Sequence, residues 1–151
     1  MQNYHPQKND ALVIQALRSK GYKATPQRVA ICKIALGSRE HPSVEKIYNE
    51  VKKTYPTVSL ATVYKTLHIL KENGLVQELN FSQGETRFDS YLEPHVNLVC
   101  TKCGKIQDFD GSDVKELVKK AALQAKFVPT VQRVDIYGIC ERCSQEKKLS
   151  D

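Results

Sequence analysis

The residues best suited to chemistry are four cysteines in two Cys-x-x-Cys pairs. Cys100 and Cys103 form the first pair, Cys140 and Cys143 form the second, and 36 residues separate the two pairs. Each pair can bind one edge of a metal ion, and four thiolates complete the closed tetrahedral sphere that zinc prefers. Gly104 follows the first pair, where a tight turn favours a residue without a Cβ. The spacing predicts a structural zinc site with no open position for catalysis.

The same cysteines have two alternative interpretations. Two disulfides would need an oxidising compartment, but the polar residues 1–10 lack the apolar run of a signal peptide, so we expect a cytoplasmic protein. A redox-active motif would need only one pair. The fifth cysteine, Cys32, falls on the apolar face of a predicted helix and is interpreted as a core residue. The sequence contains no run of about 18 apolar residues, which a membrane-spanning helix would need, so we expect no membrane span.

A second candidate site is the segment from Ser59 to Asn73-Gly74, which has helical periodicity. Val63, Leu67 and Leu70 form its apolar face, and small, hydroxyl and basic residues form the other. Such side chains suit phosphate oxygens and base edges of DNA, although the pattern alone equally fits a solvated helix face. An arginine near the start of an earlier helix can reach a phosphate. The candidate DNA-binding residues are Arg28, Ser59, Ala61, Thr62, Tyr64 and Lys65.

The elements around this segment predict a winged helix-turn-helix. Three further helices are expected at about residues 10–20, 26–37 and 44–54, the second with Thr25 as its N-cap and Pro26 at its first position. Strand-like runs at 76–81 and 86–88 flank a turn and follow the 59–73 helix directly. In this plan the helix before the hairpin enters the DNA major groove. We predict a DNA-binding domain over residues 1–89.

The pattern changes after residue 89. Residues 90–94 are predicted as a hinge, and residues 95–151 contain strands at 96–100, 105–109 and 131–139 with a helix at 114–125. A portion of about 57 residues is too small for a comfortable core, and such chains rely on a metal or a partner subunit. The predicted class is α+β: a winged helix-turn-helix followed by a small α/β dimerisation domain with a four-cysteine zinc site.

The charge balance permits an anionic partner. The net charge is +6, and residues 1–93 hold 13 Lys and Arg against 9 Asp and Glu. Zinc on four thiolates would bring the remainder close to neutral, so basic character concentrates in the N-terminal part. Composition alone leaves a nucleic-acid partner and a plain basic protein equally open.

Several further motifs occur together with these features. They are residues 24–28, His41-Pro42, residues 59–64, residues 87–89 and Tyr137-Gly138, besides the two cysteine pairs. Through these motifs the sequence resembles the ferric uptake regulator family over nearly its whole length. The resemblance implies a homodimer that binds palindromic double-stranded DNA and a second, regulatory metal, usually iron or manganese.

The resemblance also implies the ligands of the regulatory metal. Matched position by position, they are His41, Asp89, His95 and Asp108, with Asn97 at the fifth position. The family usually has a histidine where this chain has Asn97, which is a weaker and neutral donor, and Glu93 is an alternative fifth ligand. Such a mixed nitrogen and oxygen set suits Fe²⁺ or Mn²⁺. Residues 128–132 lack the histidines that build a further site in many members, so we expect one regulatory site per subunit.

Two aspartates favour the peroxide-sensing branch of this family. The resemblance implies that the iron-responsive branch more often has Glu at the positions of Asp89 and Asp108. The resemblance also implies how a peroxide sensor responds: iron-dependent oxidation of a ligating histidine releases the metal and the DNA. In this chain the candidates for that oxidation are His41 and His95.

The predicted function is therefore a metal-dependent transcriptional repressor that senses peroxide. The alternatives are an iron- or other metal-uptake regulator without peroxide sensing, and a zinc-ribbon module for protein–protein assembly. An enzyme is disfavoured, since the sequence offers neither a nucleophile–base pair nor a phosphate loop.

Overall fold

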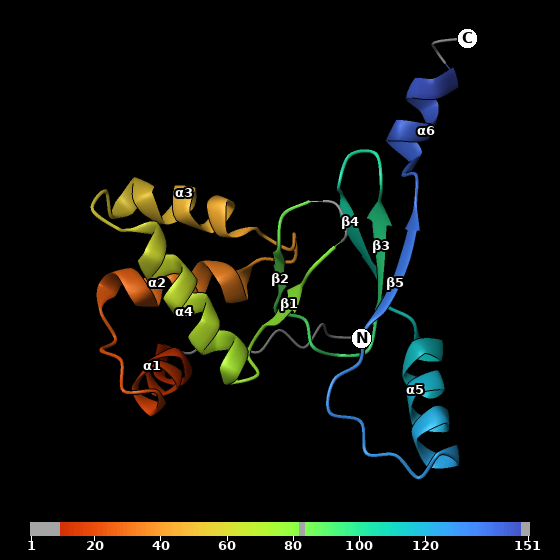
Figure 1. The fold of residues 1–151 in the computed structure, drawn as a ribbon, viewed down its shortest axis with the longest axis horizontal. Helices are drawn as coiled ribbons and strands as arrows, with labels where there is room; N and C mark the ends of the chain where they lie inside the picture. The colour runs from red at the N-terminus through yellow and green to blue at the C-terminus, as the bar shows by residue number, and fades with distance from the viewer. Residues whose placement is uncertain (1–9, 82–83, 149–151) are drawn as a thin grey trace. The chain divides into compact units, whose positions relative to one another are not determined.

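The computed structural model describes residues 10–81 and 84–148, which divide into two compact units between Leu92 and Glu93 (Figure 1). Unit 1 contains α1 (Asp10–Ser19), α2 (Pro26–Gly37), α3 (Val44–Thr54) and α4 (Leu60–Glu72), followed by the hairpin of β1 (Gln77–Leu79) and β2 (Arg87–Asp89). Unit 2 contains β3 (Val96–Cys100), β4 (Ile106–Phe109), α5 (Ser112–Gln124), β5 (Val134–Gly138) and α6 (Glu141–Lys148). The predicted α+β class is confirmed.

The helices of unit 1 begin where hydroxyl side chains satisfy free backbone N–H groups. Thr25 Oγ1 accepts from Arg28 N, Ser43 Oγ from Lys46 N, and Ser59 Oγ from Thr62 N. Pro26 occupies the first position of α2, where no N–H is needed. At the end of α4, Gly74 adopts a φ of +65°, which favours glycine. These caps fix the helix limits close to those predicted.

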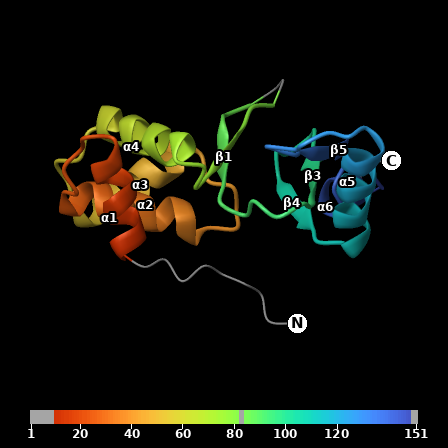
Figure 2. The same cartoon turned by 90° about the horizontal axis from the view of Figure 1, so that it is seen from below.

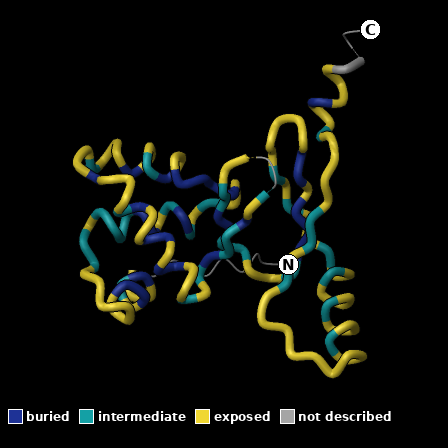
Figure 3. The backbone as a smooth tube through the Cα atoms, viewed as in Figure 1, coloured by how far each residue is buried: buried dark blue, intermediate teal, exposed yellow. Residues whose placement is uncertain are grey.

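An apolar cluster of buried residues holds unit 1 together. Figure 3 shows the buried stretches of its backbone in dark blue. The members of the cluster come from the inner faces of all four helices, with Val76 and Phe88 from the hairpin region. Cys32 is fully buried in it, as predicted. Helix α4 packs against α1, α2 and α3 (Figure 2). Its opposite face, which includes Leu60 and Tyr64, is left exposed.

Unit 2 is built on a three-stranded sheet in the order β4-β3-β5. The central strand β3 is antiparallel to β4 and parallel to β5. This sheet carries little buried apolar surface, and no residue of α5 is buried. The terminal helix α6 was not predicted, because its segment is charged and lacks an apolar periodicity.

Three strands are shorter than predicted: the run at 76–81 forms Gln77–Leu79, the run at 105–109 forms Ile106–Phe109, and the run at 131–139 forms Val134–Gly138. Residues 82 and 83 of the predicted turn lie outside the described residues. None of the described helices is long and apolar enough to cross a membrane.

Candidate metal centres and nucleic-acid surface

The ends of three elements in unit 2 bring the four paired cysteines together. Cys100 ends β3, Cys140 follows β5, and Cys143 lies in the first turns of α6. Backbone bonds of 2.9 Å from Gly104 N to Cys100 O and from Cys100 N to Lys105 O close the turn that carries Cys103. Gly104 has a φ of +72°, so the predicted need for glycine arises from backbone conformation.

The four sulfurs form one cluster whose Sγ atoms all lie within 4.8 Å of one another. The distance from Cys103 Sγ to Cys140 Sγ is 3.7 Å, close to the roughly 3.8 Å expected between sulfurs of a tetrahedral zinc site with Zn–S bonds of about 2.3 Å. All five cysteines are described, and each is a free thiol rather than part of a disulfide. The geometry therefore fits a metal and not the disulfide alternative.

Backbone N–H groups and burial shift the pKa values of these thiols in opposite directions. Hydrogen bonds from the backbone, led by the Cys140 N–H at 3.3 Å, lower the pKa of Cys100 to about 6. The backbone N–H of Lys105 lowers the pKa of Cys103, whereas burial raises that of Cys143 to about 12. Negative charge at Cys103 raises the pKa of the Arg142 guanidinium, which accordingly offsets thiolate charge at the cluster.

Unit 1 brings two of the predicted regulatory ligands close together. His41 Nε2 lies 3.8 Å from Asp89 Oδ2, and both side chains are buried. The loop before α3 is held to β2 by two hydrogen bonds, from Phe88 N to Pro42 O at 3.0 Å and from Arg87 to His41 O at 3.3 Å. His41 has a φ of +49°, a conformation that costs free energy for a side chain with a Cβ and often marks a functional position.

Unit 2 brings together the other three. His95 Nε2 lies 3.2 Å from Asn97 Oδ1 and 3.8 Å from Asp108 Oδ1. The other ring nitrogen of His95, Nδ1, is 2.7 Å from the Glu93 carbonyl oxygen, which can only accept. Nδ1 therefore donates to this carbonyl, which leaves Nε2 as the ring nitrogen that faces the two oxygens and would bind a metal. One nitrogen and two oxygens converge, as a hard or borderline divalent cation requires.

The same geometry separates the two candidates for the fifth ligand. The Glu93 carboxylate pairs with Lys115 Nζ at 3.0 Å and is largely exposed, while its backbone carbonyl orients His95. Asn97, by contrast, is 2% exposed and presents its oxygen to His95. These contacts favour Asn97 over Glu93.

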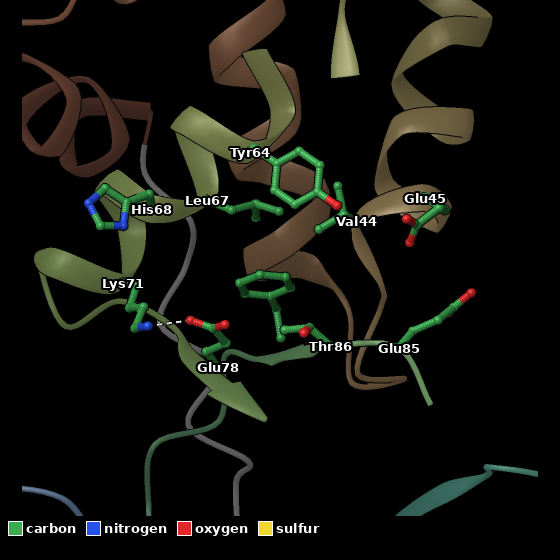
Figure 4. A pocket seen from close by; sticks show the side chains of 10 residues that line it. Val44, Glu45, Tyr64, Leu67, His68, Lys71, Glu78, Glu85 and Thr86 are labelled. Carbon is green, nitrogen blue, oxygen red and sulfur yellow. Dashed lines mark hydrogen bonds and ion pairs between the residues drawn. The ribbon is translucent and has the colours of Figure 1, made fainter. Parts of the chain in front are cut away.

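The predicted DNA-binding face of α4 is exposed. Ala61, Tyr64 and Lys65 are all exposed, and Tyr64 retains 51% of its accessible surface. Figure 4 shows Tyr64 and Leu67 beside a pocket that also contacts the start of α3 and the hairpin. The ion pair between Lys71 and Glu78 links α4 to β1 at this pocket.

Three other candidates for DNA contact already have structural roles. Ser59 Oγ caps α4 and lies 2.8 Å from Thr62 Oγ1. Arg28 stacks over the Tyr22 ring at 5.1 Å and donates to the Lys23 carbonyl at 3.0 Å. Their contacts with DNA stay predictions.

Sequence reasoning missed the contacts that orient these ligands, among them Asp135 beside Asn97. Asn97 Nδ2 donates to Asp135 Oδ1 at 3.0 Å. Strand alternation within 131–139 shows which residues share a face with Asp135. The strand register that pairs Asp135 with Asn97 cannot be deduced from a single sequence.

Comparison with known proteins gives the same family as the sequence motifs. The ferric uptake regulator family matches residues 19–137. A peroxide-responsive repressor of Staphylococcus epidermidis is 37% identical over 133 residues, 88% of this chain and 89% of that protein. A peroxide stress regulator of Campylobacter jejuni is 41% identical, with a TM-score of 0.71 over 86% of this chain and 98% of its own. The Helicobacter pylori ferric uptake regulator, 20% identical, shares the fold with a TM-score of 0.78 over 95% and 97%.

The match covers both units, and members of this family regulate transcription rather than catalyse reactions. This chain belongs to the ferric uptake regulator family.

Proposed function

We propose that this protein is a dimeric, metal-dependent repressor that senses peroxide through a regulatory Fe²⁺ or Mn²⁺. The observation that carries the proposal is the pair of donor groups, His41 with Asp89 in unit 1 and His95 with Asn97 and Asp108 in unit 2. The relatives of 37% and 41% identity, named as peroxide regulators, favour peroxide over iron supply as the signal.

The regulatory metal would take ligands from both units. His41 and Asp89 come from the proposed DNA-binding domain, residues 1–89, and His95, Asn97 and Asp108 from the proposed dimerisation domain, residues 95–151. A metal that binds both sets stabilises one relative arrangement of the domains across the 90–94 hinge, so its binding free energy couples to DNA affinity. Metal loss then lowers the affinity for a palindromic operator.

The four-cysteine cluster would hold a structural zinc in the same domain. Its closed sulfur sphere matches zinc and leaves no open coordination position. Since the sheet of unit 2 has few buried apolar residues, zinc and the partner subunit supply the stability that an apolar core supplies elsewhere.

The homodimer would form through the apolar surface of unit 2. Phe109, Leu117, Phe127, Ile136 and Ile139 are all at least half exposed. So much exposed apolar surface on a small unit is typical of an interaction site. DNA would then be contacted by α4 of each subunit, with Tyr64 and Lys65 on its exposed face.

When bound, Fe²⁺ would supply the electron that cleaves the O–O bond of peroxide, and peroxide would supply the oxygen atom and the oxidising equivalents that modify a nearby ring. His41 and His95 are the two rings that would hold the metal, so one of them would receive the oxygen and become a poorer ligand.

The test is mass spectrometry of Fe²⁺-loaded protein after peroxide, with Mn²⁺-loaded protein as the matched control. We expect a gain of one oxygen on the peptide containing His41 or His95 in the iron form alone. A gel shift with a palindromic operator should weaken in parallel. Unmodified histidines with metal-dependent DNA binding would instead support a metal-uptake regulator without peroxide sensing, and metal-independent DNA binding would overturn the regulatory role.

A further inference from the structure

Three polar residues form one row across the sheet of unit 2. The strands of this sheet lie in the order β4-β3-β5 (Figure 1). Asn97 in the central strand β3 is the register partner of Asp108 in β4 and of Asp135 in β5. Register partners carry their side chains on the same face of a sheet, and His95, two residues before Asn97, shares that face. Asn97 therefore stands between two carboxylates, of which only Asp108 is a proposed metal ligand.

The side-chain amide of Asn97 is oriented by the carboxylate on the other side. Asn97 Nδ2 donates to Asp135 Oδ1 at 3.0 Å, while Asn97 Oδ1 lies 3.2 Å from His95 Nε2. An amide nitrogen only donates and an ionised carboxylate only accepts, so Asp135 determines which end of the amide faces His95. Asn97 is buried, and little solvent is available to offer it other partners.

Asp135 is itself held in place by two neighbours. The Arg133 guanidinium lies 2.6 Å from Asp135 Oδ2, and the Tyr137 hydroxyl donates to the same oxygen at 3.3 Å. The Asp135 side chain is 14% exposed. Since both neighbours bind Oδ2, the other oxygen, Oδ1, is presented to Asn97.

We propose that Asp135 is a positioning residue for the regulatory metal and acts through Asn97. Without its carboxylate, the Asn97 amide can turn by half a rotation and point Nδ2 at His95 Nε2. The amide would then donate to the nitrogen lone pair that the metal needs, and it would offer the metal no oxygen. This inference rests on the proposed regulatory site.

The same contact explains how the sheet accepts Asn97 at a position where the family resemblance implies a histidine. A histidine there could donate one ring N–H to Asp135 and turn its other nitrogen towards the metal, the arrangement common for metal-bound histidines. Asn97 reproduces both roles with its two amide atoms, at the cost of a weaker donor. Asn97→His should therefore bind Mn²⁺ more tightly, and only while Asp135 is present.

The experiment measures Mn²⁺ affinity of the zinc-loaded full-length protein by electron paramagnetic resonance. In Asp135→Asn the amide oxygen should stay with the Arg133 and Tyr137 donors, so its NH₂ faces Asn97 and no longer accepts from Nδ2. Loss of an orienting partner typically lowers metal affinity about 10- to 100-fold, and we expect a loss of that size in Asp135→Asn. Asp135→Glu, which keeps the carboxylate, should restore part of it. Glu116→Gln, an exposed site on α5, removes the same charge from unit 2 and should leave the affinity unchanged.

A double-mutant cycle and a metal-free readout separate positioning from other effects. In an Asn97→Ala background, Asp135→Asn should cause no further loss, because Asp135 has no amide left to orient. In zinc-loaded protein without the regulatory metal, the ¹H–¹⁵N signals of the Asn97 amide should show one proton protected from exchange. Asp135→Asn should abolish that protection while zinc content stays at one per chain.

The outcomes distinguish this inference from the proposed function. Wild-type affinity in Asp135→Asn, or an equal loss in the Asn97→Ala background, would overturn the positioning role and leave the regulatory site intact. A wild-type protein that binds no Mn²⁺ would overturn the regulatory site itself, and with it the metal role of Asp135.

Discussion

The cysteines of this chain fall into two chemical environments that differ in what surrounds the sulfur. Four thiols cluster near the ends of β3 and β5 and the start of α6, where backbone N–H groups stabilise negative charge on Cys100 and Cys103. Cys32 lies in the apolar cluster of unit 1, where burial raises the pKa of its thiol to about 12. A thiolate is the reactive form, so residue type alone does not determine reactivity.

Cys32 should therefore resist alkylation in the folded protein. With a pKa of about 12, roughly one thiol in 10,000 is ionised at pH 8, since each pH unit below the pKa reduces the thiolate tenfold. Iodoacetamide applied to zinc-loaded protein at pH 8 should leave Cys32 unmodified by peptide mass, whereas denaturant with a chelator should expose all five cysteines. Labelling of Cys32 in the native state as fast as in denaturant would contradict its burial.

At the residue scale the sequence predicts ligand types better than ligand orientation. The cysteine pairs follow from spacing, because two residues between sulfurs suit one metal edge. His41, Asp89, His95 and Asp108 follow only from the family resemblance, since a single polar residue carries no distance information. The choice between Asn97 and Glu93 depends on the Lys115 and Asp135 contacts, which require strand register and helix placement.

At the element scale, helix limits are the most predictable part of the fold. Three helices begin directly after the capping residues Thr25, Ser43 and Ser59, each within one residue of its predicted start. Such starts are predictable because capping is a local interaction between residues three apart. The helix α6 and the order β4-β3-β5 were not predicted. The first lacks an apolar pattern, and the second depends on pairing between distant segments.

Ser59→Ala should lower the free energy of unfolding by about 1 kcal/mol, because α4 loses the acceptor for Thr62 N. Ser59→Asp is the matched variant, since it keeps an acceptor at the cap and adds a negative charge beside the proposed DNA surface. Urea denaturation should show the loss in Ser59→Ala and near wild-type stability in Ser59→Asp. Operator binding should fall more in Ser59→Asp; equal DNA affinity in both variants would argue against the proposed face of α4.

At the scale of the whole molecule, stability is distributed unequally between the two units. The apolar cluster lies in unit 1, and α5 in unit 2 has no buried residue. Removal of zinc with a chelator should therefore unfold unit 2 and leave unit 1 folded. In ¹H–¹⁵N spectra, signals from unit 2 should collapse to unfolded positions while those of Ile31, Ile47 and Leu67 persist. Simultaneous loss of both sets would show that the units fold as one.

The exposed apolar surface of unit 2 is the proposed interface between the two subunits. Ile136 lies on β5 with 55% of its surface exposed, and Leu98 of β3 is its register partner on the same face. Ile136→Lys puts a charge into the proposed subunit interface, where burial without a partner is costly. We expect the variant to sediment as a monomer and to bind a palindromic operator at least tenfold more weakly, roughly the effect of 1.4 kcal/mol.

Leu12→Lys is the control for this variant, because Leu12 on α1 is similarly exposed, at 50%, but belongs to unit 1. It should remain dimeric and bind the operator like the wild type. Both variants should keep one zinc per chain, which separates loss of assembly from loss of the four-cysteine site. A dimeric Ile136→Lys protein would place the subunit interface on another surface, whereas a monomer that keeps full operator affinity would break the proposed link between dimerisation and DNA binding.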